Sequence, residues 1–158
     1  MPSRRRRFYR RLRFMIDQQP QSKKISNTDA AKFQDAIVEE LEACKRSAFT
    51  GPIVLQMDLF STSKTPPAIY ALPKNYLDLL GKPKTDVRGD RQRLLYLDDR
   101  QVKALIIRQH WDCTVDCPHI CVEAEPYRDF LADIDLVDRV IRNLFDDSRD
   151  QFKYSTIE

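Results

Sequence analysis

Four charged side chains in the middle of the chain suit metal or phosphate chemistry. Lys74 and Asp78 are four residues apart, so on a helix they would share one face. Asp98 and Asp99 are adjacent and lie between two apolar runs. Grouped carboxylates can bind a divalent cation such as Mg²⁺, and a lysine beside them can neutralise a phosphate. The alternative interpretation is a surface ion pair between Lys74 and Asp78 and an ordinary turn at Asp98 and Asp99.

Asp98 and Asp99 are both candidate metal ligands, but strand geometry limits how they can act. We expect them where a strand begins, and adjacent residues of a strand point to opposite faces. Both could bind one ion only if the chain bends there. Otherwise one of the two ligates and the other supports or caps the turn.

A second group of candidate ligands lies close to the expected hairpin turn, and it is rich in sulfur. Zinc prefers thiolate and imidazole ligands at short spacings around a turn. Three cysteines and one histidine have this chemistry, although their spacing is irregular: Cys113, Cys117, His119 and Cys121. The alternative is that Cys121 is a small buried residue and that Cys113 and Cys117 are free thiols.

Positive charge is concentrated at the N-terminus. The chain has a net charge of +3, yet residues 4–13 hold seven arginines, and without these the net charge becomes −4. They are candidate contacts to nucleic-acid phosphates. The alternative is a solvated tail without specificity. The seven residues are Arg4, Arg5, Arg6, Arg7, Arg10, Arg11 and Arg13.

Composition excludes several other classes of function. Only 3 glycines occur among 158 residues, which excludes a glycine-rich phosphate loop. No stretch approaches the length of an apolar membrane span, and no apolar segment follows the basic N-terminus as in a secretory signal. The four cysteines therefore favour a reduced setting, and we expect a cytoplasmic, intracellular protein that does not bind membranes.

The elements that must position these residues follow from apolar spacing and breakers. We expect an α+β domain with a mixed sheet of about four strands, two long helices and one short helix. We expect strands at 12–16, 53–60 and 120–124, with further strand segments at 94–97 and 101–111. We expect helices at 28–46 and 127–146 and a short helix that begins at Pro73 and ends at Gly81. Residues 101–124 suggest an antiparallel hairpin. The domain organisation would be a basic flexible arm at 1–13, a single domain at 14–146 and a polar tail at 147–158.

One resemblance connects these residues to a known family. The run Lys74-x-x-x-Asp78-x-Leu80, followed after a loop by the segment Asp98-Asp99-Arg100-Gln101-Val102, resembles the RusA family of Holliday-junction resolvases. The family pattern has an acidic D-x-D-N segment, then a lysine three residues after the asparagine. A helix ending D-x-L follows, and then D-D-x-Q-V or D-D-x-Q-I. Order and hydrophobic context agree over roughly residues 50–125.

The resemblance implies a RusA-like fold and a homodimer that binds DNA. It also implies Mg²⁺-dependent cleavage of branched DNA, with Asp99 as a metal ligand, Lys74 at the phosphate, and Asp78 and Asp98 nearby. The chain departs from the pattern where D-x-D-N falls on Ala68-Ile69-Tyr70-Ala71, because both acids and the asparagine are missing. Asp58, on the preceding strand, is a further acid, but no local pattern links it to this site.

Three interpretations of function remain open from the sequence. The first is a DNA-binding protein of recombination or repair whose junction endonuclease activity is lost or reduced, because too few acids remain for two metal ions. The second is an active Mg²⁺-dependent junction endonuclease. The third is a protein-interaction or regulatory subunit that does not bind nucleic acid. In one form of this interpretation, zinc stabilises the domain. A protein partner would bind the last helix, whose outer face carries Asp129, Asp133, Asp135 and Asp138.

Overall fold

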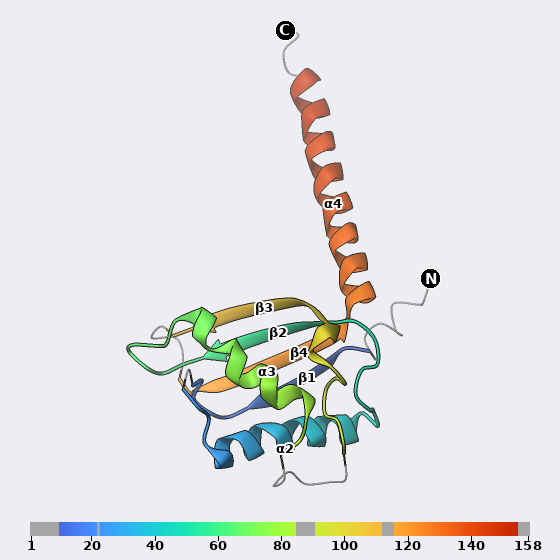
Figure 1. Ribbon diagram of the computed structural model, residues 1–158. Coiled ribbons are helices and arrows are strands. Elements are labelled where there is room, and N and C mark those ends of the chain that lie inside the picture. The colour runs from blue at the N-terminus through green and yellow to red at the C-terminus, as the bar shows by residue number, and fades with distance from the viewer. Residues whose placement is uncertain (1–9, 22, 85–90, 112–115, 155–158) are drawn as a thin grey trace. The chain divides into compact units, whose positions relative to one another are not determined.

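The computed structural model describes residues 10–21, 23–84, 91–111 and 116–154, with side chains described as far as residue 144. These residues form a mixed sheet of four strands and three α-helices, which is the expected α+β class (Figure 1). The strands are β1 (Leu12–Ile16), β2 (Ile53–Phe60), β3 (Val102–His110) and β4 (His119–Pro126). The helices are α2 (Asn27–Ala43), α3 (Pro73–Gly81) and α4 (Tyr127–Tyr154), with short 3₁₀ helices η1 (Ile69–Ala71) and η2 (Asp99–Gln101).

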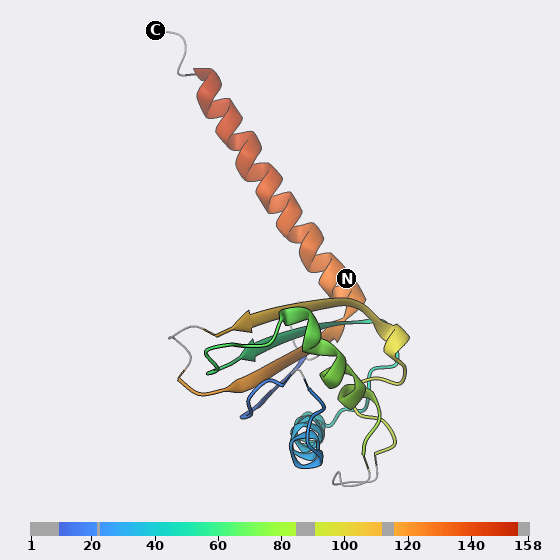
Figure 2. The ribbon, with the colours of Figure 1, turned by 60° about the vertical axis from the view of Figure 1, so that its left-hand side comes forward.

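One face of the sheet is covered by helices α2 and α3, as the two views in Figures 1 and 2 show. Strand β1 alternates buried and exposed residues, as a half-buried edge strand should. The covered face of the central strand β2 is wholly apolar, and its four side chains there are fully buried: Ile53, Leu55, Met57 and Leu59. The core therefore lies between this face and the two helices.

Helix α2 forms where the spacing predicted it. Ser26 caps its N-terminus by accepting a hydrogen bond from the backbone N–H of Asp29 at 3.1 Å. The predicted apolar face is buried, and it includes Ala30, Phe33, Ile37 and Leu41. The helix ends at Ala43, slightly before the predicted end at residue 46.

The predicted antiparallel hairpin over residues 101–124 is wrong. The strand order is β1-β4-β2-β3, so β2 lies between β3 and β4. β3 pairs with β2 in parallel, while β4 pairs antiparallel with both β1 and β2. The physical reason is that β2 is apolar enough to be central, and a central strand needs a neighbour on each side.

The segment before β3 is also different from the prediction. Residues 94–97 do not form a strand, and Tyr96 contributes only an isolated bridge to Phe49. Asp98 and Asp99 do not begin a strand either, because Asp99 opens the 3₁₀ helix η2 and β3 begins at Val102. The bend that would free the two carboxylates from strand alternation is therefore present.

The boundaries of the compact body differ from those expected. Leu12 and Arg13 belong to strand β1 rather than to the arm, and residues 1–9 lie outside the described part. The chain divides into the units Met1–Tyr127 and Arg128–Glu158. Helix α4 continues to Tyr154, through most of the expected polar tail.

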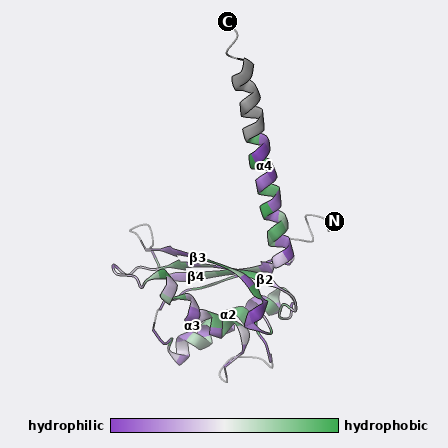
Figure 3. Ribbon diagram, turned by 45° about the horizontal axis from the view of Figure 1, so that its top comes forward, coloured by the Kyte–Doolittle hydropathy of each residue, from purple (hydrophilic) through white to green (hydrophobic). Residues whose placement is uncertain are grey.

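Helix α4 is amphipathic along its described side chains, where apolar and polar bands alternate (Figure 3). Phe130 near its start is partly buried, whereas seven of its described apolar side chains are at least 43% exposed: Leu131, Ile134, Leu136, Val137, Val140, Ile141 and Leu144. Within the described residues, no helix is both long and apolar enough to cross a membrane.

Candidate functional site

A surface pocket of about 290 Å³ collects the residues that the sequence singled out. Lys74 and Asp78 enter it from helix α3, and Asp99 enters it from η2. The other lining side chains are apolar or aromatic: Tyr70, Pro73, Leu77, Tyr96 and Val102. Lys74 and Asp78 share a helix face as expected, but no ion pair joins them within the described residues.

Helix α3 presents Lys74 and Asp78 because its other face is held in the core. Tyr76, Leu79 and Leu80 are buried, and the backbone N–H of Gln21 donates to the Tyr76 hydroxyl at 2.9 Å. At the C-terminal end of α3, the buried amide of Gln34 donates to the carbonyls of Leu79 and Lys82, at 2.8 and 3.1 Å. These contacts fix the orientation of the helix against α2.

The turn that carries Asp99 is organised by its two neighbours, Asp98 and Gln101. The Asp98 carboxylate accepts a hydrogen bond from the backbone N–H of Arg100 at 2.8 Å and caps η2. Asp98 does not line the pocket, whereas Asp99 does. The capping role that was expected of one of the two aspartates thus falls to Asp98.

Gln101 anchors this turn to the sheet through both ends of its amide. Its Oε1 atom accepts from the backbone N–H groups of Leu97 and Asp98 at 2.7 and 2.9 Å. Its Nε2 atom donates to the carbonyls of Phe49 and Gly51, both at 2.9 Å. Gln101 belongs to the D-D-x-Q-V segment, but its residue type and spacing alone indicate no role. The structure shows that it positions Asp99.

Tyr96 forms the buried side of the pocket. Its hydroxyl donates to the Leu77 carbonyl at 2.7 Å, which ties η2 to helix α3. Burial raises the pKa of Tyr96, and the nearby carboxylates of Asp99 and Asp78 raise it further. Both carboxylates line the same pocket as this phenol. Sequence reasoning missed Tyr96, because its contacts come from a different part of the chain.

Within the described residues, the pocket holds too few oxygen ligands for a two-metal centre. Asp78 and Asp99 are the only carboxylates among these residues that line it, and no group of three side chains there could hold a metal ion. Tyr70 lines the pocket where the family pattern has an acid, and its side chain is 83% exposed. Two carboxylates suffice for one Mg²⁺ completed by water or phosphate, but not for a pair of ions.

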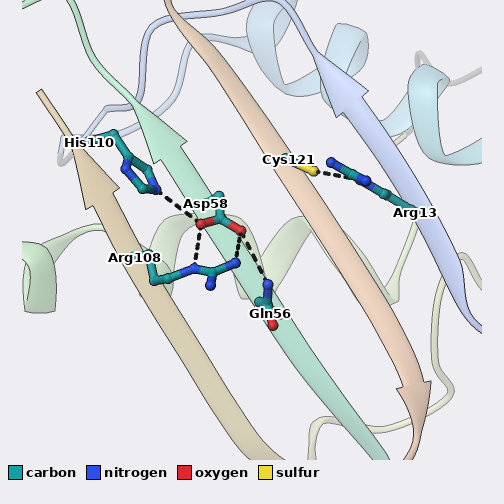
Figure 4. A network of polar contacts seen from close by, with 6 residues as sticks. All are labelled: Arg13, Gln56, Asp58, Arg108, His110 and Cys121. Atoms are coloured by element: carbon teal, nitrogen blue, oxygen red, sulfur yellow. Dashed lines mark hydrogen bonds and ion pairs between the residues drawn. The ribbon is translucent and has the colours of Figure 1, made fainter. Parts of the chain in front are cut away.

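Asp58 lies elsewhere and cannot complete the set. It does not line the pocket, and its carboxylate accepts hydrogen bonds from Arg108 at 2.6 and 2.8 Å and from Gln56 at 3.3 Å (Figure 4). The Nε2 atom of His110 is 3.1 Å from the same carboxylate. Burial raises the pKa of Asp58, but the hydrogen bonds, led by Arg108, outweigh it and lower the pKa to about 2.

Of the seven arginines, three lie in the described part of the chain. Arg11 pairs with Glu123 at 3.1 Å and with Glu125 at 2.9 Å. The Arg13 guanidinium donates to the Cys121 sulfur at 3.3 Å, and this contact raises its pKa (Figure 4). Arg10 accepts a hydrogen bond at its backbone carbonyl from Arg46 at 2.7 Å. Arg4, Arg5, Arg6 and Arg7 lie outside the described residues.

The sulfur-rich group is not assembled among the described residues. Cys113 lies outside them, and Cys117, His119 and Cys121 form no metal-binding group there. The imidazole of His119 stacks on Phe60 with ring centres 4.0 Å apart, and His110 stacks on the same ring at 4.3 Å. Among the described cysteines, Cys44, Cys117 and Cys121 carry free thiols.

Comparison with known proteins does not extend this description. No family model matches the chain, and no curated protein is significantly similar to it. The resemblance to the RusA family therefore rests on the order of residues in the sequence alone.

Proposed function

We propose that the chain is a RusA-like DNA-binding protein of recombination, repair or related DNA transactions, in which junction endonuclease activity is lost or reduced. Lys74 contacts a backbone phosphate at the pocket, and the N-terminal arginines contribute further phosphate contacts. The protein acts in the cytoplasm, and as in the resembled family it pairs as a homodimer. Its free thiols are compatible with that reducing compartment.

The grouping of Lys74, Asp78 and Asp99 around one pocket carries this proposal. Asp99 is separated from the other two by a long loop, and their spacing alone did not bring the three together. The resemblance assigned all three to one site. If α3 and η2 had lain on separate surfaces of the protein, there would be no reason for the proposal.

The chemistry of the pocket supports binding rather than cleavage. Hydrolysis by the two-metal route needs carboxylates that hold ions about 3.5–4 Å apart. The pocket provides only Asp78 and Asp99, and Tyr70 cannot replace an anionic oxygen ligand for a hard cation.

A salt titration of binding to a four-way DNA junction tests the proposal. Log affinity should fall linearly with log salt, with a slope of about −0.9 for each phosphate neutralised. Deleting residues 1–9 should remove most of this slope. Lys74→Gln should reduce it by about 1. Lys103→Gln, an exposed lysine on β3 that does not line the pocket, is the charge-matched control.

No binding to branched or duplex DNA at low salt would contradict the proposal and leave the interpretation as a protein-interaction or regulatory subunit. The same protein should be incubated with the junction and Mg²⁺ or Mn²⁺. We expect no cleavage, or slow cleavage that Asp99→Asn abolishes.

An active Mg²⁺-dependent endonuclease is the second candidate, and one observation favours it. Asp78 and Asp99 share the pocket with Lys74, so a single Mg²⁺ bound by two carboxylates, water and substrate phosphate fits the residues present. Rapid junction cleavage that depends on Asp78 and Asp99 would establish this candidate instead.

A further inference from the structure

The pocket is small and is lined mainly by apolar and aromatic side chains. Its volume of about 290 Å³ lies just below the usual range for ligand pockets, about 300–1,000 Å³. Pro73, Leu77 and Val102 give it apolar walls. A planar ring with an apolar face fits such walls, whereas a hydrated phosphate gains nothing from them.

Tyr70 supplies an aromatic surface at this pocket. It follows directly on Ile69 in η1, and its side chain is 83% exposed although it lines the pocket. An exposed tyrosine next to a cavity offers a face on which a second ring can stack, and base–aromatic stacking is tolerant of sequence.

The charges of the pocket determine which edge of a ring it accepts. Asp78 and Asp99 accept hydrogen bonds but cannot donate them when ionised. Together with Lys74 they give the pocket a net charge of −1, which disfavours a phosphate inside it but suits amino groups. Cytosine and adenine carry exocyclic amino donors, whereas thymine presents a carbonyl acceptor at the corresponding position.

We propose that this pocket binds the unpaired base of a single-stranded DNA segment, with a preference for bases that carry an exocyclic amino group. The base stacks on Tyr70, its amino group donates to Asp78 or Asp99, and Lys74 contacts the adjoining phosphate. This inference rests on the proposed DNA binding and specifies its substrate. A paired base cannot occupy the site, because its faces are covered by stacked neighbours and its amino group by the complementary base.

Fluorescence anisotropy with short deoxycytidine and thymidine homopolymers tests this assignment at constant salt. The wild-type chain should bind the deoxycytidine polymer about tenfold more tightly, as one good base contact allows. Tyr70→Ala should weaken deoxycytidine binding about tenfold, whereas Tyr70→Phe should keep it, because the stacking face remains. Ile69→Ala is the matched control, since Ile69 is the exposed neighbour that does not line the pocket.

Asp99→Asn provides a second test that does not depend on Tyr70. It should reduce the preference for deoxycytidine without removing the binding that the arginines provide. Equal affinity for both homopolymers, unchanged in Tyr70→Ala, would overturn the base pocket while DNA binding itself stands. Binding to neither the homopolymers nor the four-way junction would overturn the proposed function and the base pocket together.

Discussion

Asp98 and Asp99 have the same side chain but point it at different partners, because their backbone conformations differ. Asp98 is extended, with φ −149° and ψ 139°, and its carboxylate turns back onto the N–H of Arg100. Asp99 is the first residue of η2, and its carboxylate lines the pocket. The Asp98 carboxylate therefore has a hydrogen-bond donor in the cap, whereas the Asp99 carboxylate faces the pocket.

Asp58 should make stability depend on pH in the acidic range. Its pKa is lowered from 3.8 to about 2 in the folded protein. Its contribution to the free energy of unfolding is therefore complete above the unfolded value and is lost as pH falls through about 2. The shift corresponds to about 2 kcal/mol. Denaturant titrations of Asp58→Asn and the wild type should differ by about this amount at neutral pH and converge near pH 2.

Asp78→Asn is the control for this measurement, because it removes an exposed carboxylate that does not take part in the Asp58 network. It should leave the pH profile of stability unchanged. If the wild type and Asp58→Asn differed equally at every pH, the ionised carboxylate would not be the stabilising group.

At the scale of elements, η2 depends on Gln101 for its position. Replacing Gln101 by Ala removes the bonds to two N–H groups and two carbonyls. We expect a loss of about 1 kcal/mol in the free energy of unfolding, because three of these bonds are exposed to water and only the bond to Phe49 is partly buried. Arg100→Ala should stay within about 0.5 kcal/mol, as for most exposed residues. Urea denaturation of both variants measures the difference.

If Gln101→Ala were as stable as the wild type, the turn would be held by other contacts. A Gln101→Glu variant then distinguishes the two ends of the side chain. Glu keeps an acceptor for the N–H groups of Leu97 and Asp98, but it loses the donor to Phe49 and Gly51.

Elements with a strong local pattern were predictable from the sequence, and pairings between distant segments were not. The cap at Ser26, the alternation of 53–60 and the prolines and glycines around α3 act within a few residues, and these elements are confirmed. The predicted hairpin was wrong because β2, which is distant from both strands in sequence, takes the place between β3 and β4. That is a property of the whole sheet, and sequence neighbours do not determine it.

The residues of the pocket also divide into those that local spacing predicted and those whose contacts come from distant segments. Lys74 and Asp78 share a helix face by spacing, but their proximity to Asp99 was expected only from the resemblance. Tyr96 and Gln101 were missed because their partners, Leu77, Phe49 and Gly51, are distant in sequence. The Asp58 network likewise requires the parallel register that places Arg108 opposite Asp58.

At the scale of the whole molecule, the core is confined to one part of the chain. Its buried apolar residues run from Leu12 to Ala124, so none of those described as far as residue 144 lies in the unit that begins at Arg128. The pocket is formed by a still shorter part of the chain, since its lining residues fall between Tyr70 and Val102. This segment is most of the connection between the parallel strands β2 and β3.

The position of the missing acids in this connection predicts that they can be restored. Ala68 and Tyr70 are both exposed, so Ala68→Asp combined with Tyr70→Asp should change the melting temperature little. With Asp78 and Asp99, the new carboxylates should raise affinity for Mn²⁺, measured by calorimetry, and should permit cleavage of a four-way junction. Asn at both positions is the control. Unchanged metal affinity in the Asp variant would contradict the assignment of this pocket to the resembled family.

The pocket and the core share side chains, so occupancy of one should be felt by the other. Tyr96 lines the pocket and is also one of the largest fully buried side chains of the core. Leu77 and Val102 line the pocket as well and pack against the core cluster. A molecule that fills the pocket of the folded chain should therefore raise its melting temperature, because it binds the folded state and not the unfolded one.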